Sequence, residues 1–375
     1  MHCKFLDHGV AISYDQVVKP CCVWKYDSSW ATQNQLGSIN LDTWHQSDQV
    51  IKIKNQLAQD SWPSSCEHCY NIEKTGRGDS VRLNGAQSYA KYRGNDITLE
   101  IRPGAVCNFA CQTCWPEAST RVAQFQHQAG IIDIKDVNSQ SISNFDFLLP
   151  FANRIRNVVL LGGEPFYDKN CLKFLDWAAE HLSANITMFT NGSMIRWDWI
   201  KNYQHPITVV FSIDAVGTPA EYIRYGTEWD TVYQNFQEIQ KYNHVELRVN
   251  ITTSAYNYIY VQDVVDLLLV KWPSVVSFGV PGDAYLGTQV VPDQCRADIV
   301  TSLNQSIEKI KSTPIELGQQ QNAVNALQSI VDALETNNYD HVLHQKFKKF
   351  VQDMDRVKKI NIQDYCKFVA NMLAQ

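Results

Sequence analysis

The sequence predicts an α/β fold built around a parallel sheet, and three observations lead to this prediction. From about residue 96, short apolar runs alternate with helical patterns. Six β/α units follow one another, which implies parallel strands joined by right-handed crossovers. Polar or glycine-containing motifs follow the first four apolar runs, where the ligands of such sheets gather. The sheet is expected to be either an open doubly wound sheet or an incomplete barrel.

The expected strands are apolar runs, and helical patterns lie between several of them. Together they form the predicted core, residues 96–285. The six strands are expected at residues 96–102, 157–161, 185–190, 207–214, 245–252 and 275–280. The main helices of the core are expected at residues 170–182, 229–242 and 260–272.

Two regions flank this core. Residues 1–95 are rich in Trp, Ser, Asn and Cys and have few long periodic segments, so they have a weak core of their own. A bound metal that stabilises this region is therefore physically reasonable. Residues 286–375 are expected to form a helical C-terminal extension. Its helical patterns span residues 295–312, 322–338 and 344–360.

The composition narrows the class of protein. Of the 375 residues, 45% are hydrophobic and 19% are charged, so the chain can bury a sizeable core. The net charge of −6 argues against a broad basic surface for nucleic acid. The chain has no run of 18 apolar residues, and its first residues lack the regions of a signal peptide. We therefore expect a cytoplasmic protein without a membrane partner.

The chain has eleven cysteines, and an odd number in a reducing compartment does not suggest a disulfide framework. Eight of them, counting both members of the Cys21–Cys22 doublet, lie in tight or turn-rich settings typical of metal ligands. The other three single cysteines, Cys171, Cys295 and Cys366, are expected to be small buried hydrophobes.

Three cysteines, Cys107, Cys111 and Cys114, follow the first expected strand with the spacing C-x3-C-x2-C. A structural zinc site usually closes with four ligands. Three close thiolates can instead hold a [4Fe–4S] cluster by three of its irons and leave the fourth iron open. A Cys3His zinc site with His127 is possible but fits less well, so the pattern favours iron–sulfur chemistry.

The segment CNFACQTC (107–114) resembles the signature of the radical S-adenosylmethionine (SAM) enzymes. Three later segments resemble motifs of that family in the same order: LGGEPF (161–166), FTNGS (189–193) and FSIDA (211–215). Each of these alone would be read as an ordinary turn or strand end. Their order after the cysteine motif favours a functional role for these segments over ordinary turns and strand ends. The resemblance implies a partial (β/α)6 TIM barrel core.

The resemblance also implies roles for individual residues. The three cysteines would bind the catalytic [4Fe–4S] cluster, whose open iron would take the amino and carboxylate groups of SAM. The implied cofactor contacts are Gly162, Gly163 and Glu164 beside the methionine amino group, Ser212 and Asp214 near the ribose or carboxylate, and Thr190 and Asn191 towards the substrate.

Three further positions are less clear from the sequence. Arg224 and Arg248 could meet a carboxylate, because Arg makes bidentate contacts, or they could belong to structural ion pairs. The residue before the last cysteine of the motif is often aromatic in the family and packs beside the adenine. Here it is Thr113, which puts adenine stacking at this position in doubt.

A second set of four cysteines provides the four ligands that a closed metal site needs. These are Cys3, Cys21, Cys66 and Cys69. The C-x2-C pair presents two thiols on one tight turn. Zinc and a fully ligated [4Fe–4S] cluster both satisfy this count.

This region resembles the SPASM/twitch auxiliary-cluster module of radical SAM enzymes, in its smaller twitch form, which favours a second [4Fe–4S] cluster over zinc. The usual glycine of the first hairpin is replaced by Gln16, and the module precedes the core instead of following it. The hairpin favours Cys21 as the ligand, with Cys22 as a possible substitute.

The resemblance implies an enzyme. One electron, from a donor such as flavodoxin or ferredoxin, would cleave SAM to methionine and a 5′-deoxyadenosyl radical, which would remove hydrogen from a substrate C–H bond. The auxiliary cluster would act as an electron conduit. We expect a peptide or protein substrate. Because the chain starts at the cluster module, we expect such a peptide to dock elsewhere, either on the C-terminal helices or on a separate protein.

Two alternatives stay open at this point. The first is a small-molecule dehydrogenase or rearrangement enzyme of the same superfamily, acting on a sugar, nucleotide or other metabolite. The second, from another class, is a non-catalytic iron–sulfur or zinc-binding protein.

Overall fold

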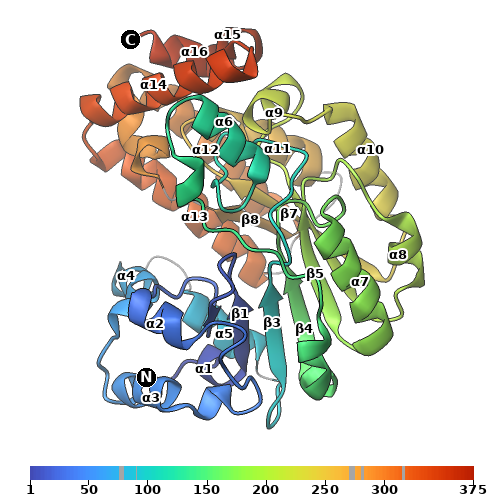
Figure 1. Ribbon diagram of the computed structural model, residues 1–375. Coiled ribbons are helices and arrows are strands. Elements are labelled where there is room, and N and C mark those ends of the chain that lie inside the picture. Colours follow the sequence, from blue (N-terminus) through green and yellow to red (C-terminus); the bar gives the residue numbers. More distant parts are fainter. Residues whose placement is uncertain (76–79, 90, 270–274, 280–282, 315–316) are drawn as a thin grey trace. The chain divides into compact units, whose positions relative to one another are not determined.

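The computed structural model describes residues 1–75, 80–89, 91–269, 275–279, 283–314 and 317–375, and every structural statement below concerns these residues. Their strands form one sheet in the order β2-β1-β3-β4-β5-β6-β7-β8 (Figure 1). The strands are β1 Gly9–Ile12, β2 Val18–Lys19, β3 Ile97–Ile101, β4 Ile155–Leu160, β5 Asn185–Thr190, β6 Ile207–Ser212, β7 Val245–Thr252 and β8 Val275–Gly279.

The order of the strands decides between the two sheets that the sequence allows. The pairs β3–β4, β4–β5 and β7–β8 are parallel. From β3 to β8, the order in the sheet follows the order in the chain. A doubly wound sheet would reverse its order at a switch point. The predicted α/β class is therefore confirmed, and the strand order is that of an incomplete barrel. Val280, the last residue of the expected sixth strand, lies outside the described residues.

The helices of the core lie close to their expected positions. They are α6 Thr120–Gln128, α7 Lys169–His181, α8 Trp197–Asn202, α9 Thr218–Ile223, α10 Trp229–Ile239 and α11 Val261–Val264. A π-helical turn, Val265–Leu269, continues α11, and residues 270–272 of the expected helix lie outside the described residues. The short 3-10 turns are Trp44–Gln46, Ser64–Cys66, Ile134–Asp136, Asp146–Arg154, Tyr258–Tyr260, Ala284–Leu286 and Thr288–Val290.

The helical patterns near the C-terminus are also confirmed. The helices there are α12 Asp293–Ser312, α13 Leu317–Thr336, α14 His341–Lys358, α15 Ile362–Tyr365 and α16 Lys367–Leu373. The N-terminal helices are α1 Phe5–His8, α2 Ser28–Gln33, α3 Asp48–Ala58, α4 Glu67–Thr75 and α5 Val81–Ser88.

The chain divides into two compact units, which are described separately. Unit 1 consists of Met1–Ala105, Asn138–Met188 and Trp197–Thr208. Unit 2 consists of Val106–Val137, Phe189–Arg196 and Val209–Gln375. The division at residues 95 and 285 that the sequence suggests stays a prediction.

Unit 1 joins the N-terminal region to the sheet. Strand β1 pairs in parallel with β3, with Val10 opposite Leu99, and β2 folds back antiparallel to β1. Figure 1 shows α1 to α5 gathered beside β1. The hairpin between β1 and β2 contains Gln16 at φ 61°, in the left-handed region. A side chain in this region costs about 1 kcal/mol, which is a physical reason to expect glycine at this position.

Unit 2 contains the C-terminal helices. Helices α12 and α13 pack together, and α14 contacts α6. The apolar faces of these helices are buried, with Leu303, Leu327 and Phe347 fully inaccessible.

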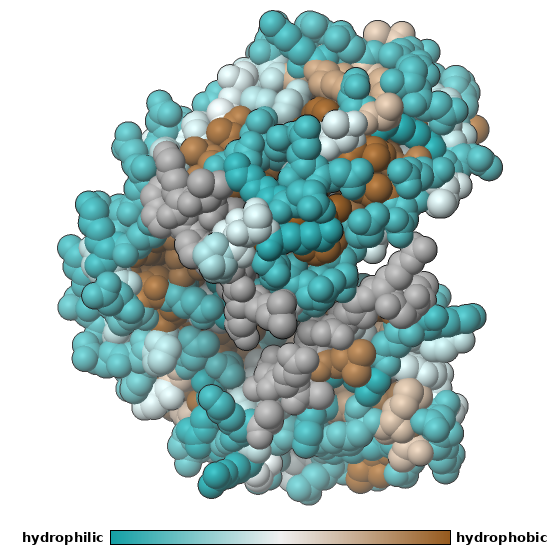
Figure 2. Space-filling view, turned by 180° about the vertical axis from the view of Figure 1, so that it is seen from behind, coloured by the Kyte–Doolittle hydropathy of each residue, from teal (hydrophilic) through white to brown (hydrophobic). Residues whose placement is uncertain are grey.

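One face of the molecule is mainly polar (Figure 2). On the face drawn in Figure 2, hydrophilic residues cover most of the surface and hydrophobic residues form patches among them. In the part of the chain that the structure describes, we find no helix with the length and hydropathy needed to cross a bilayer.

One buried histidine anchors β1 and should make unit 1 sensitive to acid. His45 Nε2 lies 3.0 Å from the carbonyl oxygen of Gly9 and donates to it. Burial lowers the pKa of His45 from 6.5 to about 4. The unfolded chain therefore takes up this proton first, and stability is lost as the pH falls from 6.5 towards 4.

We predict that this group costs the folded protein about 2 kcal/mol between pH 7.5 and pH 5. The variant His45→Gln keeps a donor for Gly9 but does not titrate, so its free energy of unfolding should fall by that much less. Urea unfolding at both pH values measures the difference. An equal loss in the two proteins would contradict the prediction.

Candidate functional site

The three cysteines of the C-x3-C-x2-C motif lie in unit 2 on a loop before α6, residues 106–119, called here the cysteine loop. Cys111 is buried, and Cys107 and Cys114 are half-buried. Burial raises the pKa of Cys114 to about 12, and the neighbouring Cys111 adds to this shift. Bringing these thiols to a metal therefore requires their protons to be displaced by the stronger bond to the metal.

Backbone hydrogen bonds fix the cysteine loop to the segment that follows α9. The N–H of Ala110 donates to Tyr225 O at 2.8 Å, and the N–H of Gln112 donates to Ile223 O at 2.7 Å. Gly226 makes the close approach possible. Its φ is 109°, and a Cβ at this position would meet the Phe109 ring at 3.0 Å. The cysteine loop and the segment after α9 therefore hold each other in place around Cys111.

The turn after β5 lies beside the first cysteine. Asn191 Nδ2 donates to Asn108 Oδ1 at 2.9 Å and lies 3.9 Å from Cys107 Sγ. The Thr190 hydroxyl oxygen accepts from the N–H of Gly192 at 3.0 Å and so shapes the turn. The structure therefore brings Asn191 to the cysteine loop, whereas Thr190 supports it from within the turn.

A buried ion pair follows β6. Arg224 Nη1 lies 2.8 Å from Asp214 Oδ2, and the second oxygen of Asp214 accepts from the N–H of Thr252 at 2.7 Å. Burial would lower the pKa of Arg224, but the charges of Cys111 and Asp214 outweigh it and raise this pKa. The guanidinium is therefore held as a fixed positive charge close to the cysteine loop.

This guanidinium borders a pocket in unit 2. The pocket is lined by Asn191, Ser212, Ile213, Ala215, Ala220, Arg224, Thr227, Trp229 and Val232. Arg224 Nε is buried and has no hydrogen-bond partner among the described residues. An unused buried donor on a fixed cation, next to a hydroxyl and an amide, fits an anionic group such as a carboxylate.

The glycine motif lies in unit 1, after β4. A Cβ on Gly162 would meet Cys171 Sγ at 2.8 Å and Gly104 O at 3.1 Å. The N–H of Gly163 donates to the same Gly104 oxygen at 3.2 Å. Glu164 is 1% exposed, and its Oε1 accepts from the N–H of Phe166 at 3.2 Å. Within unit 1, the small size of Gly162 is explained by packing against Cys171 and Gly104.

The remaining predicted residues have ordinary surroundings. Arg248 forms an exposed ion pair with Glu246 at 2.7 Å, which is the structural role that the sequence left open. Thr113 is half-buried. The aromatic residue nearest to it in sequence is Trp115, just after the motif, which is 54% exposed.

The second cysteine set converges in unit 1. Cys3 precedes α1, Cys21 follows β2, Cys66 ends a 3-10 turn and Cys69 lies in the first turn of α4. All four line one pocket, and Cys22 is not among its lining residues. The pocket is otherwise largely apolar and includes Phe5, Leu6, Trp24, Leu57, Trp62 and Val81.

The thiols of this pocket influence one another. Burial raises the pKa of Cys66 to about 12, and charge on Cys3 and Cys69 adds to the shift. Burial also raises the pKa of Cys21 well above its usual value, with the nearby thiols as further causes. Within the described residues, no three His, Cys, Asp or Glu side chains form a ready site for a single metal ion.

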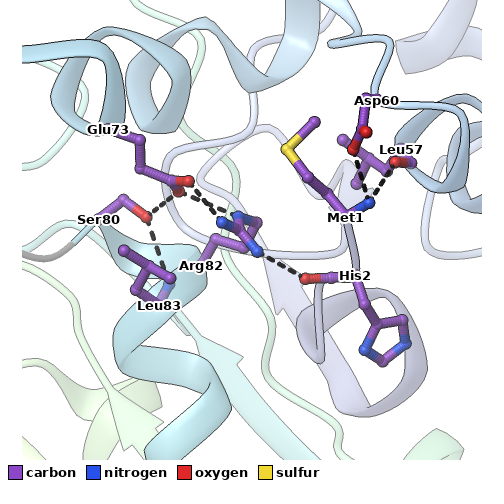
Figure 3. A network of polar contacts seen from close by, with 8 residues as sticks. All are labelled: Met1, His2, Leu57, Asp60, Glu73, Ser80, Arg82 and Leu83. Atoms are coloured by element: carbon purple, nitrogen blue, oxygen red, sulfur yellow. Dashed lines mark hydrogen bonds and ion pairs between the residues drawn. The ribbon is translucent and has the colours of Figure 1, made fainter.

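Arg82 forms hydrogen bonds to two of the segments that carry these cysteines (Figure 3). Its Nη1 donates to His2 O at 2.9 Å, next to Cys3, and its Nε donates to Glu73 Oε1 on α4 at 3.0 Å. Burial alone would raise the pKa of Glu73, but hydrogen bonds from Arg82 and Ser80 lower it. The ionised pair fixes the start of the chain to α4, which carries Cys69.

Sequence reasoning missed several residues that shape these sites. Asn108 lies inside the cysteine motif, whereas Arg82 and Gly226 lie outside the recognised motifs, and all three have partners in distant segments. Lys358 lies at the end of α14 and contacts the cysteine loop across 248 residues of sequence. The three single cysteines, Cys171, Cys295 and Cys366, are all buried, as expected.

Comparison with known proteins gives only distant relatives. No family model and no curated protein matches the chain. Among solved structures, it is similar to native anSMEcpe with bound AdoMet, at 17% identity over 56% of this chain and 61% of that chain, with a TM-score of 0.41.

A second similar structure is Streptococcus suis SuiB bound to S-adenosylmethionine, at 15% identity over 76% of this chain and 62% of that chain, with a TM-score of 0.39. SuiB bound to the precursor peptide SuiA gives 16% identity over 70% and 58% of the two chains and a TM-score of 0.38. The matches span about three fifths of each of these proteins.

The pocket in unit 1 leads to a prediction about the cysteine doublet. Cys21 lines the pocket with the other three thiols, whereas Cys22 does not. If a cubane cluster occupies this pocket, Cys21→Ser should remove about four irons per chain, and Cys22→Ser should remove none. Iron and acid-labile sulfide after anaerobic reconstitution measure this. Loss of iron in Cys22→Ser alone would reverse the assignment.

Proposed function

We propose that this protein is a radical SAM enzyme. Cys107, Cys111 and Cys114 would hold a catalytic [4Fe–4S] cluster, and the pocket beside Arg224 would receive part of SAM. The observation that carries the proposal is the arrangement of unit 2. There, hydrogen bonds fix a three-thiol loop beside a pocket that contains an unused, buried guanidinium donor.

The residues of unit 2 suit these roles. Asp214 and Arg224 hold each other, so Arg224 Nε is oriented before any ligand arrives and can receive a carboxylate without reorganisation. Ser212 and Asn191 add polar groups to the same pocket. A reduced cluster held there would pass one electron to bound SAM, whose C–S bond would break to give methionine and a 5′-deoxyadenosyl radical that removes hydrogen from a substrate C–H bond. Gly162, Gly163 and Glu164 are proposed to contact the cofactor as well.

The pocket of unit 1 is proposed to hold an auxiliary [4Fe–4S] cluster through Cys3, Cys21, Cys66 and Cys69. Four thiols in an apolar pocket suit a fully ligated cluster, because burial and the hydrogen bonds around it tune its potential. A fully ligated cluster has no open iron for substrate. It would therefore act as an electron conduit. The external electron donor to the enzyme would be a protein such as flavodoxin or ferredoxin.

We propose a peptide or protein as the substrate. Large apolar side chains are exposed next to the motifs of unit 2: Val106 is 42%, Trp115 54% and Met194 44% exposed. They adjoin Cys107, Cys114 and Ser193 in sequence. Exposed aromatic and methionine side chains are typical of surfaces that bind peptides or proteins. A small-molecule dehydrogenase is the other candidate and would need a more enclosed pocket.

The proposal predicts SAM cleavage that depends on Cys111. Reconstituted protein with reductant should release 5′-deoxyadenosine, and Cys111→Ala should reduce this to background and remove about four of about eight irons per chain. Cys366→Ala is the matched control, because it removes another buried thiol of unit 2 that lies outside the loop. Chromatography of the nucleoside and metal analysis measure both effects.

The metal content separates the alternatives. Four irons with one zinc would keep the catalytic site but remove the electron conduit, and a redox-neutral reaction would follow. Two zincs with little iron, and no 5′-deoxyadenosine, would refute the radical mechanism and favour a binding protein.

A further inference from the structure

Lys358 brings the C-terminal region to the cysteine loop. It is the last residue of α14 and is only 4% exposed. Its Nζ donates to the backbone oxygen of Ala110 at 2.8 Å and to Gln112 Oε1 at 3.1 Å. These two residues flank Cys111, so one ammonium group contacts the loop on both sides of the central cysteine.

The end of α14 fixes this lysine in place. Lys359 follows in the left-handed conformation, with φ 56°, and ends the helix. The Tyr225 hydroxyl donates to the backbone oxygen of Lys358 at 3.2 Å. The ammonium lies over two rings, 5.1 Å from the centroid of Tyr225 and 5.9 Å from that of Phe125. A lysine with this many fixed contacts is not a mobile surface cation.

The ammonium has no carboxylate partner within ion-pair distance among the described residues. The nearest carboxylate on its own helix, Asp355, accepts instead from the Tyr222 hydroxyl at 2.7 Å and from the N–H of Ile362 at 2.8 Å. The other charged group facing it is Arg121, which carries the same sign. A buried cation without a bonded anion is costly, and the charge of Asp355 offsets part of this cost.

The cysteines of the loop would supply negative charge once a metal holds them as thiolates. Burial lowers the pKa of Lys358 to about 7, and negative charge on Cys111 is the largest effect that opposes it. Cys114 acts in the same direction. Thiolates that bind a metal stay ionised, so a cluster on this loop would give Lys358 a permanent counter-charge.

We propose that Lys358 is a positioning residue for the catalytic cluster: it clamps the loop around Cys111, and its charge favours the reduced cluster. This inference rests on the proposed function. Reduction adds one electron from the external donor and makes the thiolate-bound cluster more negative. A fixed positive charge in a low-dielectric site stabilises that state more than the oxidised one.

The test uses the full chain after anaerobic reconstitution. Lys358→Met removes the charge and keeps the length and apolar stem. The midpoint potential of the cluster whose electron paramagnetic resonance signal responds to SAM should become more negative. We expect at least a tenfold shift in the reduction equilibrium, which corresponds to 59 mV for one electron. Lys358→Arg keeps the charge and should keep the potential close to that of the wild type.

Lys359→Asn is the matched control. It removes one positive charge at the next position, where the side chain is exposed, and Asn tolerates the left-handed conformation. Its potential should stay unchanged. The melting temperature of the cluster-free proteins separates folding from electrostatics, because a merely structural lysine would lower it without moving the potential. If Lys358→Met does not fold, Lys358→Gln replaces it as the neutral variant.

Two failures can be told apart. Wild-type protein that holds no iron–sulfur cluster would overturn the proposed function and this inference together. A wild-type cluster whose potential is the same in the neutral variants would overturn the role of Lys358 alone. A negative shift that is equal in Lys358→Met and Lys359→Asn would also overturn it, because it would reflect net charge and not this contact.

Discussion

Two backbone hydrogen bonds, from Ala110 to Tyr225 and from Gln112 to Ile223, are the constraint on which the candidate site of unit 2 depends. The loop between them has no regular secondary structure, so its shape comes from its partners. Gly226 allows the loop to approach, and the fixed backbone places Cys111 in the buried interior of the unit. A metal site gains affinity when its ligands are held before binding, and here distant segments hold them.

The same arrangement balances charge. Unit 2 buries two cations near the loop, Arg224 and Lys358, and only Arg224 has a bonded carboxylate, Asp214, among the described residues. A buried ammonium without a bonded carboxylate is unfavourable in a low-dielectric interior. A cluster held by three thiolates would bring net negative charge to the same region. The burial of Lys358 and the cysteine motif are thus two parts of one electrostatic arrangement, although they lie far apart in the sequence.

Much of this could be predicted from the sequence, because the signals are local. Strands β3 to β8 are short segments rich in apolar residues, and the motifs after β3, β5 and β6 mark the polar ends of these strands. The spacing of Cys66 and Cys69 likewise indicates a paired turn. What could not be predicted are contacts made by common residues in ordinary patterns. The lysine pair at the end of α14 is typical of any helix C-terminus, and nothing in it indicates that Lys358 is buried while Lys359 is exposed.

Two glycines also have structural roles that the sequence alone does not reveal. Gly162 belongs to a recognised motif, and the resemblance assigns it to the cofactor, but within unit 1 its size is already required by Cys171 and Gly104. Gly226 belongs to no recognised motif, yet its positive φ is what admits the cysteine loop. A residue type therefore indicates that space is needed, whereas only the fold shows what needs it. For this chain, the residues that support the loop are as informative about chemistry as the cysteines themselves.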